Sequence, residues 1–386
     1  MTKQRVLYPS VETPAVIVDL DKLEANIREM SQVAAEAGIR LRPHTKVHES
    51  VEIAKMQIEA GACGIEVGPI GQAEAMAEEG IDDILIAHPG FYGYHKLETL
   101  KKLLNIPGLK ITVVIDMFEQ AEGVSQAGHE AGKKVPVVIK VDTNTGANGI
   151  ARYGVLPGKP TLELAKKLRK LQGVQFIGIY AHEMGGTEGP EKMAFESASQ
   201  VAETARMLKR EGFKIEHVSM GASFTFRYTC HYIKEGKFPE ITEIHPGSCV
   251  LGDISYVKMG GNKSIETCAA SVLTTVMSTS HPDWFVIDAG YKTFGAAEVK
   301  SLNTWGGMTS RGFVKDRPDL WVGFAFAETT KIYYTEPRQG KLSIGERLEI
   351  VPNSILIVVN TKDQLYGVRN NKVERIIRIT GRGRGV

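Results

Sequence analysis

Lys46 is the residue best placed for covalent chemistry in this sequence. It ends the run RLRPHTK, in which we expect a buried strand from Arg40 to Lys46. Burial penalises an ammonium ion, so a desolvated lysine has a lowered pKa and an amine that condenses with aldehydes. On residue type alone, a solvent-facing lysine just past a strand is the simpler interpretation.

Two segments with small residues could bind an anion, namely Gly221-Ala222-Ser223 and Gly247-Ser248. Each follows a predicted strand, and small residues let backbone N–H groups approach a phosphate. His182 and His245 end neighbouring predicted strands and could face a flat aromatic ligand. Alone, either glycine segment would be an ordinary turn and each histidine would more often be a core residue, but together they describe a site for pyridoxal phosphate.

The elements that position these residues form a repeating pattern. Val- and Ile-rich runs alternate with amphipathic stretches, which predicts βα units. The expected strands are 40–46, 64–68, 84–87, 110–116, 135–142, 176–182, 217–221 and 243–246. The expected helices are 22–37, 49–60, 72–79, 96–104, 118–131, 162–171 and 191–211. The pattern favours an α/β fold with a (β/α)8 TIM-like barrel, and an open doubly wound sheet is the alternative.

Barrel enzymes gather their functional groups at the carboxyl ends of the strands. These ends carry more polar residues here than packing needs: His44, Lys46, Glu66, His88, Asp116, Asp142, Tyr180, His182, Ser223 and His245.

A second domain is expected after the barrel. From about Lys263 the sequence changes to short β-like runs such as DWFVIDAG, KIYYTEP and GERLEIVPNSILIVVN, without helical stretches. We therefore expect a barrel over residues 15–262 and a C-terminal all-β domain over 263–386. The segment 1–14 is expected to pack on the β domain.

Composition excludes several classes of function. The 386 residues are 42% hydrophobic, and 47 Lys and Arg against 45 Asp and Glu leave a net charge of +2. Such a balance provides no broad surface for nucleic acid or anionic lipid. No apolar run approaches the roughly 18 residues of a membrane span, and the first ten residues lack a signal-peptide core. We expect a cytoplasmic protein whose four cysteines, lacking CxxC spacing, are ordinary core residues.

Several motifs are similar to those of one enzyme family. RPHTKVHES, TPAVIVDLDKLEANI, EVGPIGQAEAMAEEGIDDILIAHP, IYAHEMGG and TEIHPGSCVLGD resemble the D-threonine aldolase and D-serine dehydratase family. The resemblance implies a fold III pyridoxal phosphate enzyme, with an alanine-racemase-like barrel, a β domain and a homodimer. It also implies that Lys46 forms the Schiff base, that Tyr180 lies beside it and that His182 faces the pyridine ring.

The resemblance assigns the remaining cofactor contacts. It implies that Arg152 reaches the phenolic side of the cofactor and that Gly221, Ser223, Gly247 and Ser248 hold the phosphate. His245 stands where alanine racemases have an arginine bonded to the pyridine nitrogen. A histidine need not protonate that nitrogen, which would leave a weaker electron sink.

The family's metal motif is altered. Relatives carry Pro-Asn-His-x-Cys or Pro-Asn-His-x-Asp, whereas this sequence has Ser354 and Leu356 at the two ligand positions. Leucine cannot coordinate a metal and serine is a poor ligand, so we expect no metal site of the usual kind. If an ion did bind, the oxygens of Glu328 and Asn353 would suit Mg²⁺ or Mn²⁺.

Three functions agree with these residues. The first is a lyase that acts on a D-configured β-hydroxy amino acid through the Lys46 aldimine, with a side chain in place of the metal. The candidates for that side chain are Asp288, Tyr291, Lys292, Glu328 and Thr330. The second is an amino acid racemase, which needs a proton donor on each cofactor face. The third is a non-catalytic pyridoxal phosphate carrier, against which the long β domain argues.

Overall fold

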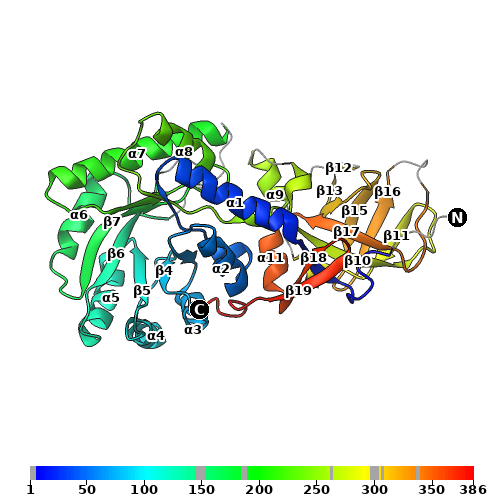
Figure 1. The fold of residues 1–386 in the computed structure, drawn as a ribbon, viewed down its shortest axis with the longest axis horizontal. Helices are drawn as coiled ribbons and strands as arrows, with labels where there is room; N and C mark the ends of the chain where they lie inside the picture. Colours follow the sequence, from blue (N-terminus) through cyan, green and yellow to red (C-terminus); the bar gives the residue numbers. More distant parts are fainter. Residues whose placement is uncertain are drawn as a thin grey trace.

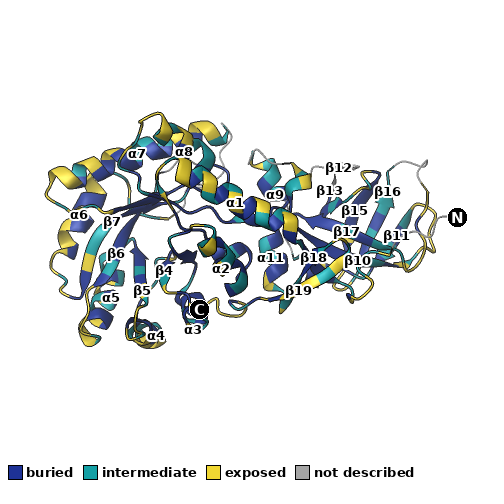
Figure 2. Ribbon diagram, viewed as in Figure 1, coloured by how far each residue is buried: buried dark blue, intermediate teal, exposed yellow. Residues whose placement is uncertain are grey.

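The computed structural model describes residues 6–143, 153–183, 189–260, 264–295, 304–305, 308–335 and 340–386. It shows an α/β barrel joined end to end with a β-rich domain (Figure 1). Buried residues line the barrel strands and the centre of the β-rich domain, whereas exposed residues follow the outer faces of the helices (Figure 2). Within the described residues, no helix has the length and apolar character that crossing a membrane requires.

Eight parallel strands form the barrel, in the order β2-β9-β8-β7-β6-β5-β4-β3. Their bounds are β2 Arg40–Leu41, β3 Ile65–Val67, β4 Asp83–Ile86, β5 Lys110–Ile115, β6 Val135–Val141, β7 Val174–Ala181, β8 His217–Met220 and β9 Glu243–Ile244. A parallel bridge between His44 and Glu66 joins the two ends of this order. From β3 to β9, each strand pairs with the next strand along the chain, whereas the strand order of a doubly wound sheet reverses direction. The predicted α/β fold class is therefore confirmed.

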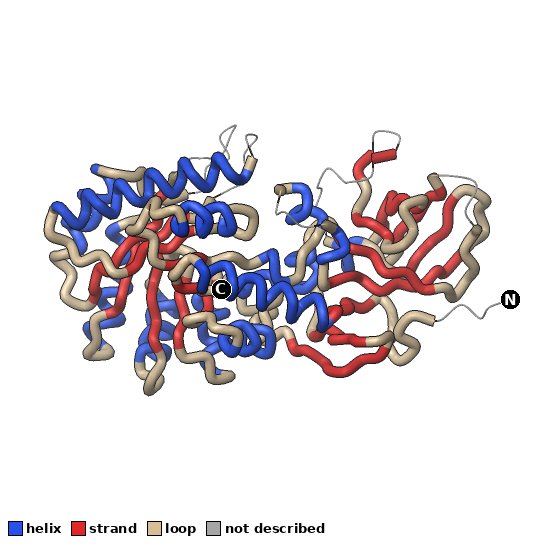
Figure 3. Tube along the Cα trace, turned by 45° about the horizontal axis from the view of Figure 1, so that its top comes forward, coloured by secondary structure: helices blue, strands red, loops and turns tan. Residues whose placement is uncertain are grey.

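Helices cover the outside of the curled sheet (Figure 3). They are α1 Leu20–Glu36, α2 Val51–Glu59, α3 Ile70–Glu78, α4 Tyr94–Leu104, α5 Phe118–Glu130, α6 Lys159–Leu168, α7 Pro190–Arg210 and α8 Phe226–Lys234. The strands are rich in Val and Ile because both of their faces are buried. In β6, Val137 and Ile139 pack with the outer helices, and Val138 packs with Tyr180 inside the barrel.

The second domain is a mixed sheet with mostly antiparallel pairs. Its strands are β1 Ala15–Asp19, β10 Ala270–Ser278, β11 Trp284–Ile287, β14 Gly312–Val314, β15 Leu320–Ala325, β16 Thr330–Tyr334, β17 Arg347–Pro352, β18 Gln364–Arg369 and β19 Lys372–Arg378. A separate hairpin pairs β12 Thr304–Trp305 with β13 Met308–Thr309. Although β1 precedes the barrel in the chain, it pairs with β10 and β18 and so belongs to this sheet.

A short helix, α9 Ile254–Lys258, follows the last barrel strand. Two more short helices, α10 Tyr291–Phe294 and α11 Ile355–Asn360, lie in the second domain, where the sequence predicts β structure alone. The prediction was wrong over α11, because a short apolar run such as ILIVVN does not distinguish helix from strand by its periodicity. Pro352 is the last residue of β17, as expected of a residue that has no N–H for the strand ladder.

Candidate active site

Lys46 lies in a 3-10 turn just past the first barrel strand. The predicted strand to Lys46 is too long: β2 ends at Leu41, and the turn spans Thr45–Val47. The Nδ1 atom of His44 accepts the backbone N–H of Lys46 at 3.3 Å, which fixes the direction of the turn. Helix α11 of the β-rich domain packs against this turn, so the lysine lies where the two domains meet.

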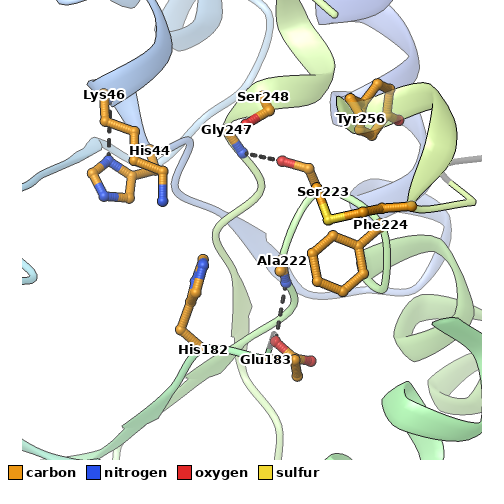
Figure 4. A pocket seen from close by; sticks show the side chains of 11 residues that line it. His44, Lys46, His182, Glu183, Ala222, Ser223, Phe224, Gly247, Ser248 and Tyr256 are labelled. Atoms are coloured by element: carbon orange, nitrogen blue, oxygen red, sulfur yellow. Dashed lines mark hydrogen bonds between the residues drawn. The ribbon is translucent and has the colours of Figure 1, made fainter. Parts of the chain in front are cut away.

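A cavity of about 200 Å³ opens beside Lys46. We call it the Lys46 cavity; its lining residues are His44, Lys46, His182, Glu183, Ala222, Ser223, Phe224, Gly247, Ser248, Tyr256 and Met259. Figure 4 shows Lys46 and His44 on one side, with Ser223, Gly247 and Ser248 across from them. The cavity therefore contains an amine and, facing it, the predicted anion-binding segments.

The segments across the cavity suit an anion. The Gly247 N–H donates to Ser223 Oγ at 2.9 Å, which ties the two loops together. In the described part of the chain, the amides of Ser223, Phe224 and Ser248 donate to no other group. A Cβ atom at Gly247 would lie 2.8 Å from the carbonyl oxygen of His44, so only glycine fits there. Unused amides beside a hydroxyl are what a phosphate group needs.

Glu183 supports one of these loops, a role that sequence reasoning missed. Its Oε2 atom accepts the N–H groups of Gly221 and Ala222, both at 3.1 Å. Burial raises the pKa of this carboxyl, and the two amides oppose that rise. Gly221 consequently lies outside the cavity lining, and its amide holds the loop instead of facing a ligand. The only sequence signal for Glu183 is its place beside His182 at a strand end.

The two predicted histidines form a stacked pair. His182 lines the cavity, and its Nδ1 lies 3.1 Å from Nε2 of His245. The rings are 5.3 Å apart at an interplanar angle of 15°. His245 is fully buried behind His182, and its Nδ1 lies 2.8 Å from the hydroxyl of Ser219. A ligand in the cavity would therefore meet His182 directly and His245 only through it.

Tyr180 lies deeper in the barrel, outside the cavity lining. Its ring stacks on His245 at 4.5 Å, and its hydroxyl donates to Glu66 Oε1 at 2.9 Å. Glu66 is fully buried, and burial raises the pKa of its carboxyl. The sequence signal for Glu66 was its position at the end of the second barrel strand, and no role was predicted for it.

The remaining predicted residues lie elsewhere. Arg152, the predicted contact to the phenolic side of the cofactor, falls outside the described residues.

The five candidates to replace the metal have other contacts. Asp288 accepts hydrogen bonds from Thr13, Thr274 and Thr275, which is a structural role between strands. Thr330 is buried and donates to the carbonyl of Ala289 at 2.6 Å. Lys292 pairs with Glu328 in an exposed position, and Arg311 donates to the hydroxyl of Tyr291 at 2.9 Å. None of the five candidates to replace the metal lines the Lys46 cavity.

Comparison with known proteins identifies the family. The family description "Alanine racemase, N-terminal domain" matches residues 18–254, and "Putative serine dehydratase domain" matches residues 269–368. A 3-hydroxy-D-aspartate aldolase of Paracoccus denitrificans (strain Pd 1222) is 30% identical over 97% of this chain and 93% of its own length. The chain belongs to the D-threonine aldolase and D-serine dehydratase family.

Two further relatives agree with this assignment. The D-threonine aldolase of Arthrobacter sp is 30% identical, over 97% of this chain and 93% of its own. The crystal structure of D-threonine aldolase from Filomicrobium marinum superposes with a TM-score of 0.83, at 27% identity, and covers 98% of this chain and 99% of that one. The likeness thus extends through both domains.

Asn353 and Leu356 belong to the segment in which the sequence predicts an altered metal motif. Leu356 packs against the apolar core. Asn353 is buried, and its Nδ2 donates to the carbonyl of Ser310 at 2.7 Å. The described residues include no group of three or more His, Cys, Asp or Glu side chains that could hold an ion. The donors at this position do not fit a divalent ion, and the expected lack of the family's metal site stays a prediction.

Proposed function

We propose that this protein is a pyridoxal phosphate-dependent lyase, of the aldolase or dehydratase type, for a D-configured β-hydroxy amino acid. The observation that carries the proposal is the Lys46 cavity, which places an amine opposite unused backbone amides and a serine hydroxyl. The family supports it, since relatives of similar length and about 30% identity are aldolases named for such substrates. We further propose that the reaction proceeds without the family's usual metal.

The residues of the cavity suit the cofactor. Lys46 would hold its aldehyde carbon, and Ser223, Gly247 and Ser248 would hold its phosphate. His182 would lie against its ring. When bound, pyridoxal phosphate supplies an electron sink for the bonds at the substrate Cα.

The protein's own groups would then handle protons. The Lys46 amine lines the cavity, so whenever it is not linked to the cofactor it could take a proton from, or give one to, the reacting atoms. His182 is a second titratable group in the cavity lining, so it can take the proton of the substrate's β-hydroxyl in cleavage or give one to it in dehydration. Phe224 and Tyr256 are buried apolar members of the lining and would reduce the contact of these transfers with water.

A metal-independent lyase makes a direct prediction about chelators. D-threonine, D-serine and D-alanine are each incubated with the holoenzyme before and after extensive dialysis against EDTA. We expect aldehyde release or keto acid release from a β-hydroxy substrate, with less than a twofold change after EDTA, because Leu356 cannot coordinate an ion and Ser354 is a poor ligand. The products are measured by coupled dehydrogenase assays.

Other outcomes separate the alternatives. Activity that is lost with EDTA and restored by Mn²⁺ or Zn²⁺ would contradict the metal-free reaction while leaving the lyase intact. Inversion of D-alanine without release of product would indicate a racemase. A protein that binds the cofactor and turns over neither these three amino acids nor 3-hydroxy-D-aspartate would be a carrier.

We also propose that the protein is a homodimer. Phe324 and Phe326 lie on or beside β15 with 60% and 48% of their surface exposed, and their rings contact each other. Exposed aromatic residues of this kind are enriched in protein interfaces. Light scattering should give about twice the 42.3 kDa mass of one chain. A monomer mass at micromolar concentration would contradict the proposal, and Phe324→Ser should weaken the dimer.

A further inference from the structure

Glu66 lies inside the barrel behind the Lys46 cavity, surrounded by three rings. Its Oε1 atom accepts the Tyr180 hydroxyl at 2.9 Å and lies 3.5 Å from Nε2 of His44. Its Oε2 atom lies 3.7 Å from Nδ1 of His245, an atom that also lies 2.8 Å from the hydroxyl of Ser219. In the described part of the chain, this second oxygen is buried without a hydrogen-bond partner. A buried carboxyl of this kind is costly unless a neighbouring group shares a proton or a charge with it.

Two of these rings connect Glu66 with the cavity. His245 passes the contact to His182, whose ring lines the cavity. His44 lines the cavity itself, and its Nδ1 accepts the backbone N–H of Lys46. Glu66 is therefore connected with the cavity by two routes. One route is His44 alone, and the other is His245 followed by His182.

The charges that face Glu66 come from several strands. The charges of Lys46 and Arg42 lower its pKa, and that of Glu243 raises it. Tyr180 and His245 face it from β7 and from the segment that follows β9, and His44 from the segment that follows β2. On β6, the Nζ atom of Lys140 lies over the ring of Tyr153, 3.6 Å from the ring centroid. The histidines are thus the groups in contact with Glu66 that change charge near neutral pH.

We propose that Glu66 is a positioning residue that shares a proton with the His245–His182 pair and so sets the charge that His182 presents to the cavity. Interacting carboxyl and imidazole groups titrate as one unit, whichever atom holds the proton. The inference rests on the proposed function for its catalytic meaning, because the charge of His182 governs its use as an acid or a base. The proton sharing itself concerns this chain alone and is tested without cofactor.

The test is a histidine titration by NMR. Cofactor-free protein labelled with ¹⁵N-histidine is titrated from pH 5 to 9, as wild type and as Glu66→Gln, Tyr180→Phe and Glu349→Gln. Glu349 is the matched control, because it is a partly buried carboxylate that pairs with Lys315 in the β-rich domain. Spectra of His182→Asn and His245→Asn proteins assign the signals.

The two cluster variants should shift the titration in opposite directions. Glu66→Gln should lower the apparent pKa of the His182 and His245 signals by about 1–3, because glutamine cannot carry the opposing charge. Tyr180→Phe should move the shared titration to higher pH, because the phenol lowers the pKa of Glu66 and its loss lets the carboxyl keep its proton longer. Glu349→Gln should leave these signals in place.

A wild-type measurement keeps the proposal testable if Glu66→Gln does not fold. With ¹³C-carboxyl-labelled glutamate, the Glu66 signal should titrate at the same midpoint as the two histidines. Histidine titrations unchanged in Glu66→Gln, or a Glu66 midpoint near 4–5 that the histidines do not share, would overturn the proposal. In the holoenzyme, Glu66→Gln should shift the acidic limb of the pH profile of kcat/KM in the same direction as the histidine titrations. An inactive wild type with the expected titrations would contradict the proposed function and leave the proton sharing intact.

Discussion

Replacing Lys46 with alanine should abolish both the cofactor absorbance near ~420 nm and lyase turnover. Lys46 is the lysine that lines the cavity, opposite the amides of Ser223, Phe224 and Ser248. Alanine removes the amine that holds the cofactor aldehyde and the group that exchanges a proton with substrate. We expect kcat to fall by roughly 10³-fold or more, as for other nucleophile deletions. Absorbance spectra after reconstitution with pyridoxal phosphate, together with initial rates, provide the measurement.

Two matched variants control for this change. Lys55→Ala removes an exposed lysine of α2 and should keep the band and the rate. Lys46→Arg retains a positive charge and should still lose the band, because a guanidinium does not condense with aldehydes at neutral pH. Retention of the band in Lys46→Ala would place the covalent link at another lysine and remove the basis of the proposed function.

The sequence predicts the barrel well because its signals are local. Strand β6 reads VPVVIKV and helix α7 carries apolar residues at three- and four-residue spacing, so period alone separates them. The strand ends then indicate which side chains meet, and Lys46, His182, Ser223, Gly247 and Ser248 do line one cavity.

The features that the sequence does not predict depend on contacts between distant segments. The contacts of Glu66 come from residues 44, 180 and 245, which lie far apart in the chain, so no local spacing pattern predicts this cluster. Glu183 is a strand-end carboxyl whose partners, Gly221 and Ala222, lie on the next strand's loop. Pairing is equally non-local for β1, which precedes the barrel but joins the sheet of the second domain.

The opposite end of the barrel carries a second set of charged groups, in which Arg42, His217 and Glu243 are buried, Asp83 is partly buried and Arg40 is exposed. We call these five residues the base cluster. Glu243 is fully buried, and its Oε2 lies 3.1 Å from Nε of Arg42. The other end of the Arg42 guanidinium donates to Asp83 at 2.6 Å, and His217 Nε2 lies 3.3 Å from Glu243 Oε1. Asp83, His217 and Glu243 are the first residues of their strands, so these charges fill the amino-terminal end of the barrel.

The base cluster links stability to pH. Burial alone would raise the pKa of Glu243, but His217, Arg42 and Arg40 outweigh it and lower that pKa from 4.5 to about 2. A carboxyl whose pKa is depressed on folding stabilises the native state above the unfolded pKa, and that contribution is lost as the pH falls through the folded pKa. Wild-type stability should therefore decrease as the pH falls from 4.5 to 2.

Arg42→Met should destabilise the protein by about 3–5 kcal/mol at pH 7, because it leaves the buried carboxylate of Glu243 without its closest counter-charge. Urea unfolding followed by circular dichroism measures the free energy of unfolding. The double variant Arg42→Met/Glu243→Leu should lose less than Arg42→Met alone, because no isolated charge remains. Arg42→Met should also flatten the decrease of stability between pH 4.5 and 2, because Glu243 then titrates closer to its unfolded pKa.

An exposed ion pair provides the comparison. Lys102 of α4 contacts Glu74 and Glu78 on the surface, and Lys102→Met should change the free energy of unfolding by less than about 1 kcal/mol. If Arg42→Met cost no more than Lys102→Met, water would have to reach Glu243 in the native state, and the barrel end would be open. If the double variant were less stable than Arg42→Met, Glu243 would be held mainly by Arg40 and His217, and the acid dependence would persist in Arg42→Met.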